Sequence, residues 1–377
     1  MAEALFWFFL FLPFCAWVGY PLALAALCPF IGKRETPEAQ PQSISIIVAA
    51  HDEAAHIERR LSSLLAERHP AALEVILASD GSGDNSVAIA RAFADPRLKV
   101  LDLPRQGKAA ALNAAVREAR HAILVFTDVD NHWQDDTLMH LLAPFADPEV
   151  GCCAGNEQIP CAGRALSVGD RLYRRYENWL RGMENRAGCV LSADGALLAL
   201  RRELFQPVPA EVTDDFFLCT CAAAAGKRVV YVEQARVHSC GVDETARQFR
   251  RRVRITVGGL QSLASRRNLM NPLRHGFLAI ALICHKALRR LAPPLLPPLF
   301  LCSLMLWNAG AFYRFALIAQ LFGYAFGVIG LLDRRGRLPK PFRLAGFLLV
   351  TLAGMNVGLW QFLRGRRYGL WVPQRNC

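Results

Sequence analysis

Two aspartates that follow an apolar stretch are the residues whose types and spacing most clearly allow chemistry. Asp128 and Asp130 come directly after Ile123 to Thr127, which has the length and composition of a strand. Residues two apart in an extended segment point the same way, so both carboxylates can face one divalent ion. Such oxygen ligands suit Mg2+ or Mn2+ held jointly with the phosphates of a substrate. The alternative is a strand end with two solvated aspartates.

Comparable groups of polar and small residues follow three other predicted strands. Ligands bind at the carboxyl ends of strands in open α/β sheets, so these strand ends together define one candidate site. A helix N-terminus already favours anions, and a lysine placed there adds a positive charge that strengthens anion binding. The groups are His51-Asp52-Glu53 after the first strand, Asp80-Gly81-Ser82-Gly83-Asp84 after the second, and Gly107-Lys108 after the third.

The strands that position these groups alternate with helices between Ser43 and Val150. Alternation at this spacing predicts an α/β fold with a mostly parallel sheet and flanking helices. After Val150 the pattern loosens into mixed strands and helices. The predicted strands are 44–50, 73–79, 98–103 and 122–127, and the predicted helices are 54–67, a segment through 91–94, and 108–120.

Apolar segments at both ends predict a membrane protein. Hydrophobic residues make up 53% of the 377 residues while charged residues still make up 20%, which indicates a soluble part joined to membrane-embedded parts. The segment from Ala4 to Ile31 is long enough to cross a bilayer, and we expect a retained anchor because it lacks a basic start and a cleavage site. Three further candidates are 291–309, which four prolines make the least regular, 312–332 and 344–362.

The basic residues flank these apolar segments. The net charge is +12, yet the arginines gather at segment ends rather than in a pattern that predicts a nucleic-acid partner. This placement follows the positive-inside bias and predicts a multi-pass protein of the cell membrane with Lys33 to Arg290 in the cytoplasm. Four simple spans would not leave both 334–343 and 364–375 inside, so either the last segment is re-entrant or one span is miscounted. The basic flanks are Lys33-Arg34, Arg289-Arg290, 334–340 and 364–367.

The segment from Ser43 to Leu263 resembles the family 2 glycosyltransferases, which have the A-type fold that binds nucleotide-diphospho-sugars. The resemblance implies that Glu53 contacts the nucleotide and that Asp80 bonds the uracil or the ribose. It implies that Lys108 lies in a loop that binds the donor. It also implies that Asp128-Val129-Asp130 is the metal-binding Asp-x-Asp motif, with Asp128 at the nucleotide-sugar.

Two later motifs extend the resemblance. Thr213-Asp214-Asp215 with Leu218 resembles a Thr-Glu-Asp-x-x-Leu motif, which implies that Asp215 is the catalytic base. Asp214 is assigned to the acceptor side, and its charge is expected to raise the pKa of Asp215. Asp194 and Gly195 lie where the family places an acceptor-side loop.

The last motif departs from the family pattern. Processive members carry Gln-x-x-Arg-Trp, whereas Gln248 and Arg251 are followed here by Arg252. The resemblance assigns Gln248 to the acceptor side. Arg251 and Arg254 bind the donor pyrophosphate in one interpretation and lie on anionic lipid in another, and both roles are compatible. The missing tryptophan argues against polymer synthesis and leaves sugar transfer untouched.

We therefore expect an inverting glycosyltransferase that moves a sugar from a nucleotide-diphospho-sugar, by resemblance a UDP-sugar, to a hydroxyl of a lipid or lipid-linked acceptor at the bilayer. Mg2+ or Mn2+ is the expected cofactor. The alternatives are a processive polysaccharide synthase and a non-catalytic membrane scaffold with the same fold. A nucleotidyltransferase would need a glycine-rich loop where the sequence has His51-Asp52-Glu53.

The predicted organisation has five parts. Residues 1–32 form an N-terminal anchor, and 43–263 form a cytoplasmic glycosyltransferase domain. An interfacial amphipathic segment is predicted at 264–290. The C-terminal transmembrane segments then occupy 291–363, and 364–377 form a basic tail.

Overall fold

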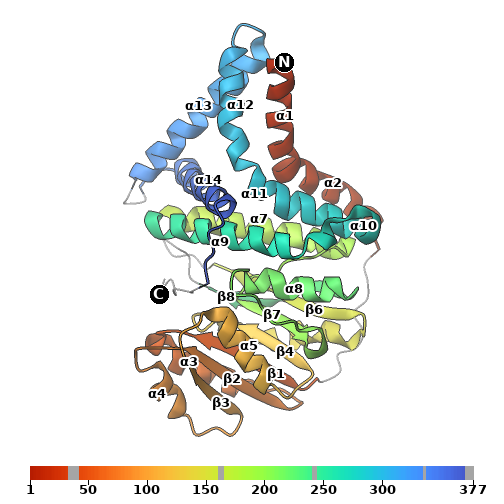
Figure 1. Cartoon of the computed structure of the whole chain (residues 1–377), viewed down its shortest axis with the longest axis vertical. Helices are drawn as coiled ribbons and strands as arrows, with labels where there is room; N and C mark the ends of the chain where they lie inside the picture. The colour runs from red at the N-terminus through yellow and green to blue at the C-terminus, as the bar shows by residue number, and fades with distance from the viewer. Residues whose placement is uncertain (33–41, 160–164, 240–243, 334–336, 370–377) are drawn as a thin grey trace. The chain divides into compact units, whose positions relative to one another are not determined.

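The computed structural model describes residues 1–32, 42–159, 165–239, 244–333 and 337–369 (Figure 1). These residues form two compact units. The sheet unit comprises Ile31–Pro160, Asn178–Cys240 and Tyr368–Cys377, and the helical unit comprises Met1–Phe30, Cys161–Glu177 and Gly241–Arg367. The basic positions Lys33, Arg34 and Arg334, which the membrane prediction used, lie outside the described residues.

A mixed sheet of eight strands is the centre of the sheet unit. Its strands are β1 Ile44–Ala50, β2 Leu73–Asp80, β3 Leu98–Leu103, β4 Ile123–Thr127, β5 His132–Trp133, β6 Val150–Gln158, β7 Leu197–Arg201 and β8 Arg228–His238, in the order β3-β2-β1-β4-β7-β6-β8-β5. Strands β3, β2, β1 and β4 are parallel, so their carboxyl ends meet at one edge. Strand β7 runs antiparallel to β4 and β6, β5 runs antiparallel to β8, and β6 and β8 are parallel.

Helices cover both faces of this sheet (Figure 1). The helices α3 Ala54–Ala66, α4 Ser86–Arg91 and α6 Thr137–Leu142 pack on one face, and α5 Lys108–Glu118 and α8 Asp214–Ala224 pack on the other. Successive residues of a strand point to opposite faces, so β1 contributes Ile46 to one core and Ile47 to the other. Strand β1 is buried along its whole length, as a strand covered on both faces must be.

The predicted α/β fold is confirmed, with one difference in the sheet. Strands β1 to β4 fall within a residue of the predicted ranges and are parallel. The sheet continues beyond them with antiparallel pairs at β7, so the whole sheet is mixed. This continuation lies after Val150, where the sequence pattern no longer alternates regularly.

Three helical stretches of the helical unit are long and apolar enough to cross a membrane, among the residues described: Ala2–Phe30, α13 Ala311–Leu332 and α14 Lys340–Leu363. The predicted segment 291–309 instead forms a 3-10 turn, Pro293–Leu295, and the shorter helix α12 Leu296–Met305. Prolines lack the backbone donor that a regular helix needs, which accounts for the interruption. The first stretch contains α1 Ala2–Phe14 and α2 Tyr20–Leu27, and the remaining helices are α7 Ala165–Ala187, α9 Thr245–Ser265, α10 Pro272–Ala281 and α11 Arg289–Leu291.

Glycines let helices of this unit approach closely. A Cβ atom at Gly330 of α13 would lie 1.9 Å from the carbonyl oxygen of Phe342 in α14. A Cβ at Gly354 or Gly358 of α14 would lie 2.8 or 2.7 Å from side-chain atoms of α9. This small-x-x-x-small spacing is typical of closely packed helices in membranes. Helix α9 lies in the helical unit with the apolar helices, and the predicted division at 263/264 stays a prediction.

A buried ionic cluster joins three segments of the helical unit. Glu177, on α7, accepts a hydrogen bond from Arg289 Nη1, and its other oxygen lies 3.1 Å from His285 Nε2. Arg289 also donates to the Tyr176 hydroxyl at 2.6 Å and to the carbonyl of Ala16 at 3.3 Å. Glu177, His285 and Arg289 are at most 5% exposed, so this charge pair is removed from water.

Candidate active site

Lys108 connects the two acidic motifs. Its Nζ donates to Asp128 Oδ1 at 2.8 Å and lies 2.9 Å from Asp214 Oδ2. Lys108 begins α5, Asp128 follows β4 and Asp214 begins α8, so three segments that are distant in the sequence converge at one point of the sheet unit. The three side chains are 18%, 30% and 25% exposed, so a ligand is able to reach them.

Asp128 and Asp130 form a pair of carboxylates. Their two negative charges are more than the single positive charge of Lys108 balances. Burial raises the pKa of Asp128, and repulsion from Asp130 and Asp214 adds to it, while Lys108 opposes the shift. Burial likewise raises the pKa of Asp130, with a contribution from Glu157. A bound cation would relieve this repulsion.

The donor set of this pair fits a divalent cation shared with a substrate. Carboxylate oxygens are the ligands that Mg2+ and Mn2+ prefer, and such ions commonly complete their coordination with water and phosphate oxygens. Within the described ranges no group of three or more His, Cys, Asp or Glu side chains is placed to hold a metal. Asp128 and Asp130 therefore suit a metal whose other ligands come from solvent or from a diphosphate.

Asp215 stands beside Asp214 in the first turn of α8. Its Oδ1 accepts a hydrogen bond of 2.7 Å from the Phe216 N–H. Burial raises the pKa of Asp215 to about 6, with further contributions from Asp214 and Asp194, while Phe216 and Lys108 oppose the shift. A carboxylate with this pKa is ionised at neutral pH and is a stronger base than an ordinary aspartate.

A buried arginine supports the strand end that carries Asp128. Arg60, on α3, is 2% exposed, and its Nη2 donates to Thr127 Oγ1 at 2.5 Å. Its guanidinium lies 4.7 Å from the centre of the Trp133 ring. Thr127 in turn donates to the carbonyl of Ala196 at 2.9 Å. The residue before Asp128 is thereby fixed to both α3 and the loop before β7.

Asp80 holds the loop that presents Lys108. Its carboxylate accepts hydrogen bonds from the N–H groups of Gln106 at 2.7 Å and Gly107 at 2.8 Å, and it is 1% exposed. Gly107 has a φ of 99°, a conformation that favours glycine. The carboxylate that the resemblance assigned to uracil or ribose therefore bonds the chain itself, and its nucleotide role stays a prediction.

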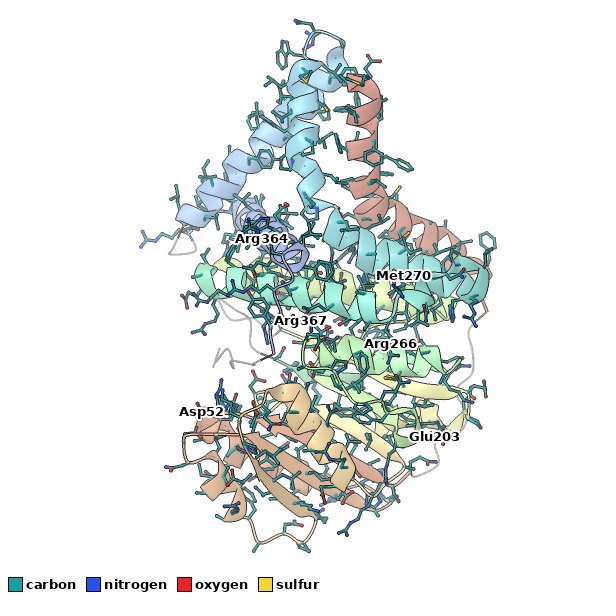
Figure 2. All side chains as sticks on the ribbon, in the orientation of Figure 1. Asp52, Glu203, Arg266, Met270, Arg364 and Arg367 are labelled. Carbon is teal, nitrogen blue, oxygen red and sulfur yellow. The ribbon has the colours of Figure 1, made fainter. Side chains whose placement is uncertain are left out.

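The loops after β1 and β2 are joined at the same sheet edge. The N–H of Glu53 donates to Ser86 Oγ at 2.8 Å, and the Glu53 side chain is buried. Asp52, labelled in Figure 2, has a φ of 53° and accepts a hydrogen bond of 2.7 Å from the Gly83 N–H. These bonds fix Glu53 at the edge where the nucleotide was predicted to bind.

The predicted acceptor-side loop also reaches this edge. Arg181, in the last turns of α7, donates to both carboxylate oxygens of Asp194, with Nη2 at 2.8 Å from Oδ1. A Cβ atom at the neighbouring Gly195 would lie 3.6 Å from Asp128 Oδ2 and 3.9 Å from Lys108 Nζ. Gly195 therefore lies against the Lys108–Asp128 pair, whereas Asp194 is held in an ion pair.

The predicted residues of the last motif lie in the helical unit, on α9. Arg251 Nη1 is 3.3 Å from Asp170 Oδ2, and Arg252 Nη2 is 3.6 Å from Asp170 Oδ1. Asp170 is 1% exposed, and the two arginines hold its pKa below the usual range although burial alone would raise it. Gln248 is buried. A pyrophosphate role for Arg251 and Arg254 stays a prediction.

Sequence reasoning does not identify Arg60 and Arg181 as parts of this site. No feature of the sequence distinguishes Arg181 from the other arginines, which are frequent along α7. The sequence does distinguish Arg60, because its spacing places it on the buried face of α3 with Ile57 and Leu64. An arginine on such a face is rarely buried unless it has a partner, which would have pointed to a nearby carbonyl, hydroxyl or acid.

The comparison with family models finds a match in the part of the chain that carries these residues. Residues 45–207 match the model described as glycosyl transferase family 2. The match contains Glu53, Asp80, Lys108 and the Asp128–Asp130 motif, and it ends before Asp214.

Curated relatives share part of this region. A poly-beta-1,6-N-acetyl-D-glucosamine synthase of Staphylococcus epidermidis is 26% identical over 173 residues, which are 45% of this chain and 42% of the relative. An N-acetylglucosaminyltransferase of Rhizobium meliloti is 27% identical over 240 residues, which are 58% of this chain and 56% of the relative. The chain thus spans about half the length of the curated relatives it matches.

A solved structure resembles the chain over nearly its full length. A mannosyltransferase from Pyrobaculum calidifontis, solved in complex with GDP-Man and Mn2+, superposes with a TM-score of 0.73. The likeness covers 97% of this chain and 100% of that one at 24% identity, so it establishes the fold.

Proposed function

We propose that the chain, whose residues 45–207 match the glycosyl transferase family 2 model, is an inverting enzyme that moves one sugar from a nucleotide-diphospho-sugar to a hydroxyl of a lipid or lipid-linked acceptor. One observation carries the proposal. Lys108 contacts both Asp128 and Asp214, which brings the Asp-x-Asp motif and the acidic start of α8 to one point. Sugar transfer needs one group that neutralises charge on the diphosphate and another that removes a proton from the alcohol. Both groups must lie near the same sugar carbon.

Asp215 is the proposed base of the reaction. The acceptor hydroxyl loses its proton as it attacks the sugar carbon, and a base contributes on the order of 10²–10⁴-fold to such a step. The ammonium of Lys108 favours negative charge that develops on the departing diphosphate. Asp128 and Asp130 would hold a divalent metal, which would supply further positive charge at the same place. One in-line displacement converts an α-linked donor into a β-linked product.

The donor that we propose is a UDP-sugar. Support comes from the resemblance to family 2 and from relatives whose names specify N-acetylglucosamine. The solved structure that shares the fold holds GDP-Man instead, so the base and the sugar require a direct assay. The same structure holds Mn2+, which supports a divalent cofactor and leaves the choice between Mn2+ and Mg2+ to that assay.

The acceptor that we propose is a membrane lipid or a lipid-linked glycan, used on the cytoplasmic side of the cell membrane. Three helical stretches of membrane-spanning length support the membrane location. Arg289 and Arg290 at the end of an apolar stretch, together with the basic flanks of the other segments, support the cytoplasmic side through the positive-inside bias.

A processive synthase is the second candidate, because two relatives are named for polymer synthesis or for transfer of the same sugar. Arg252 stands where processive members have tryptophan. Its guanidinium pairs with Asp170 and lies 4.7 Å from the centre of the Tyr173 ring. This arginine is engaged within its own unit, which favours single transfer.

Product size distinguishes the two candidates. Membranes that contain the full chain are incubated with a panel of radiolabelled UDP- and GDP-sugars and then extracted with organic solvent. Single transfer to a lipid gives one discrete labelled species in the organic phase. A labelled high polymer that stays in the insoluble residue would contradict single transfer, and no label in either phase would contradict the enzyme assignment.

Removal of divalent metal is expected to lower transfer by roughly 10²–10³-fold, the factor that several kcal/mol of charge stabilisation represents. Chelator-treated protein should regain activity when Mn2+ or Mg2+ is added back. The Asp128→Asn variant should regain little, because one of the two carboxylates is lost. The measurement is transfer rate against metal concentration, and full activity in excess chelator would contradict the metal role.

Asp214→Asn is expected to move the acidic limb of the pH–rate profile to lower pH. The pKa of Asp215 is raised to about 6 in part by the charge of Asp214, so its removal lowers that pKa. The base then stays ionised at a lower pH, although it is weaker. Asp214→Glu keeps the charge and serves as the control. A profile that is identical in the Asp214→Asn variant and the wild type would exclude this coupling.

A further inference from the structure

An apolar groove of about 450 Å³ lies between α12, α13 and α14 of the helical unit. Its wall includes Pro297 and Phe300 of α12, Tyr324 of α13, and Leu352 and Asn356 of α14, and it has no charged residue. The Phe300 and Tyr324 rings lie 6.2 Å apart, centre to centre, and form one side. Helices α13 and α14 are long and apolar enough to cross a membrane, so the groove lies among helices of membrane-spanning length and composition.

A second hollow of about 460 Å³ adjoins the groove along α14. Both are lined by Leu349 and Ala353, which are one turn apart on the same stripe of the helix. The second hollow differs in its rim, which includes Thr245 and Arg250 at the start of α9. Both volumes lie within the range of ligand sites in proteins.

One cation, Arg250 of α9, is among the residues that line the second hollow. Arg250 is exposed, so a ligand is able to reach it. Lys340 and Arg343 occupy the first turn of α14, before the residues that line the hollow. An apolar groove that adjoins a hollow lined by one exposed arginine complements an amphiphile with a hydrocarbon chain and an anionic head.

We propose that α12, α13, α14 and the start of α9 bind one anionic lipid, with a hydrocarbon chain in the apolar groove and its phosphate at Arg250. Charge complementarity selects this occupant over an uncharged lipid, because a basic residue near an anionic lipid adds favourable energy that a zwitterionic head group would not receive. The site lies entirely within the helical unit, and it does not depend on the proposed transfer reaction.

Native mass spectrometry of the full chain, released from nanodiscs, tests the site. Nanodiscs contain phosphatidylcholine with either phosphatidylglycerol or further phosphatidylcholine. We expect one retained phosphatidylglycerol per chain. Ala353→Trp, which places a bulky ring at an exposed position between the two hollows, should abolish the retention. Arg250→Gln should reduce the preference for phosphatidylglycerol about five-fold, the factor for one cation at an anionic lipid surface.

Two matched variants control for general effects. Ile318→Trp adds the same ring at an exposed position of α13 that lines neither hollow, and Arg274→Gln removes an exposed arginine from α10. Both should retain the lipid as the wild type does. Equal retention of the two lipids, unchanged retention in Ala353→Trp, or a dimer in place of a lipid adduct would each overturn the proposal.

Photolabelling of the wild-type chain keeps the test independent of variant folding. A phosphatidylglycerol with a photoactivatable group at the end of one acyl chain is added to nanodiscs, and the labelled peptides are sequenced. Labels concentrated on α12 and on the residues of α13 and α14 that line the groove support the proposal. Labels spread evenly over all exposed apolar helices would show a general lipid shell and would overturn it.

Discussion

The Asp215→Asn variant is expected to lose sugar transfer by roughly 10²–10⁴-fold in kcat. The amide has nearly the shape of the carboxylate but does not accept a proton from the acceptor hydroxyl. Binding of the donor should persist, because Lys108, Asp128 and Asp130 are unchanged. The measurements are the initial rate at saturating donor and acceptor and, separately, the donor Kd.

An exposed carboxylate provides the matched control for this variant. Asp102 has a side chain that is 48% exposed and pairs with Arg91, an exposed partner, so Asp102→Asn should leave both the rate and the melting temperature close to wild type. If Asp215→Asn were to keep its rate while folding normally, another group would have to be the base. A loss of donor binding equal to the loss of rate would indicate damage to the whole site instead.

The first half of the fold follows from local sequence signals. Strands such as β1 are short, apolar and separated by helices with one apolar face, and that combination leaves few topologies besides a parallel sheet. Strand β7, in contrast, has an apolar sequence that does not indicate whether the strand runs parallel or antiparallel to its neighbours. Its antiparallel place between β4 and β6 depends on pairing with strands far away in the sequence.

The positions of the site residues were more predictable than their partners. Strand-end rules bring Asp128 and Lys108 to one edge, and the contact between them agrees with that. No rule indicated that Asp80 would accept two backbone hydrogen bonds or that Asp194 would be paired with Arg181. A carboxylate has the same sequence signature whether it bonds a ligand or the chain, and only the three-dimensional contacts separate the two uses.

The last motif shows the same limit. From the sequence, Arg251 had two compatible roles, at a pyrophosphate or on anionic lipid. The structure adds a third partner, the buried Asp170, which belongs to a segment more than 80 residues earlier in the chain. A buried acid with two arginines is expected to keep both of them in place, since an unpaired buried charge is costly.

The largest expected effect on stability comes from the ionic cluster of the helical unit. Arg289→Met should lower the free energy of unfolding by about 3–5 kcal/mol, because it leaves Glu177 buried without its main partner. Glu177→Gln should have a similar effect through the uncompensated Arg289. The double variant should be less destabilised than the sum of the two, since neither charge then remains alone. Denaturant unfolding in a constant detergent measures all four proteins.

The pH dependence of unfolding gives the same cluster a second test. Burial alone would raise the pKa of Glu177, but Arg289 and His285 lower it well below its usual range. The folded pKa lies below that of the unfolded chain, so the pair contributes its full stability above the unfolded value of about 4.3 and loses it as the pH falls toward the folded value. Glu177→Gln should therefore flatten the acid side of the stability curve. A wild-type curve that is already flat there would mean that solvent reaches the pair. The expected loss of about 3–5 kcal/mol in the free energy of unfolding would then be too large.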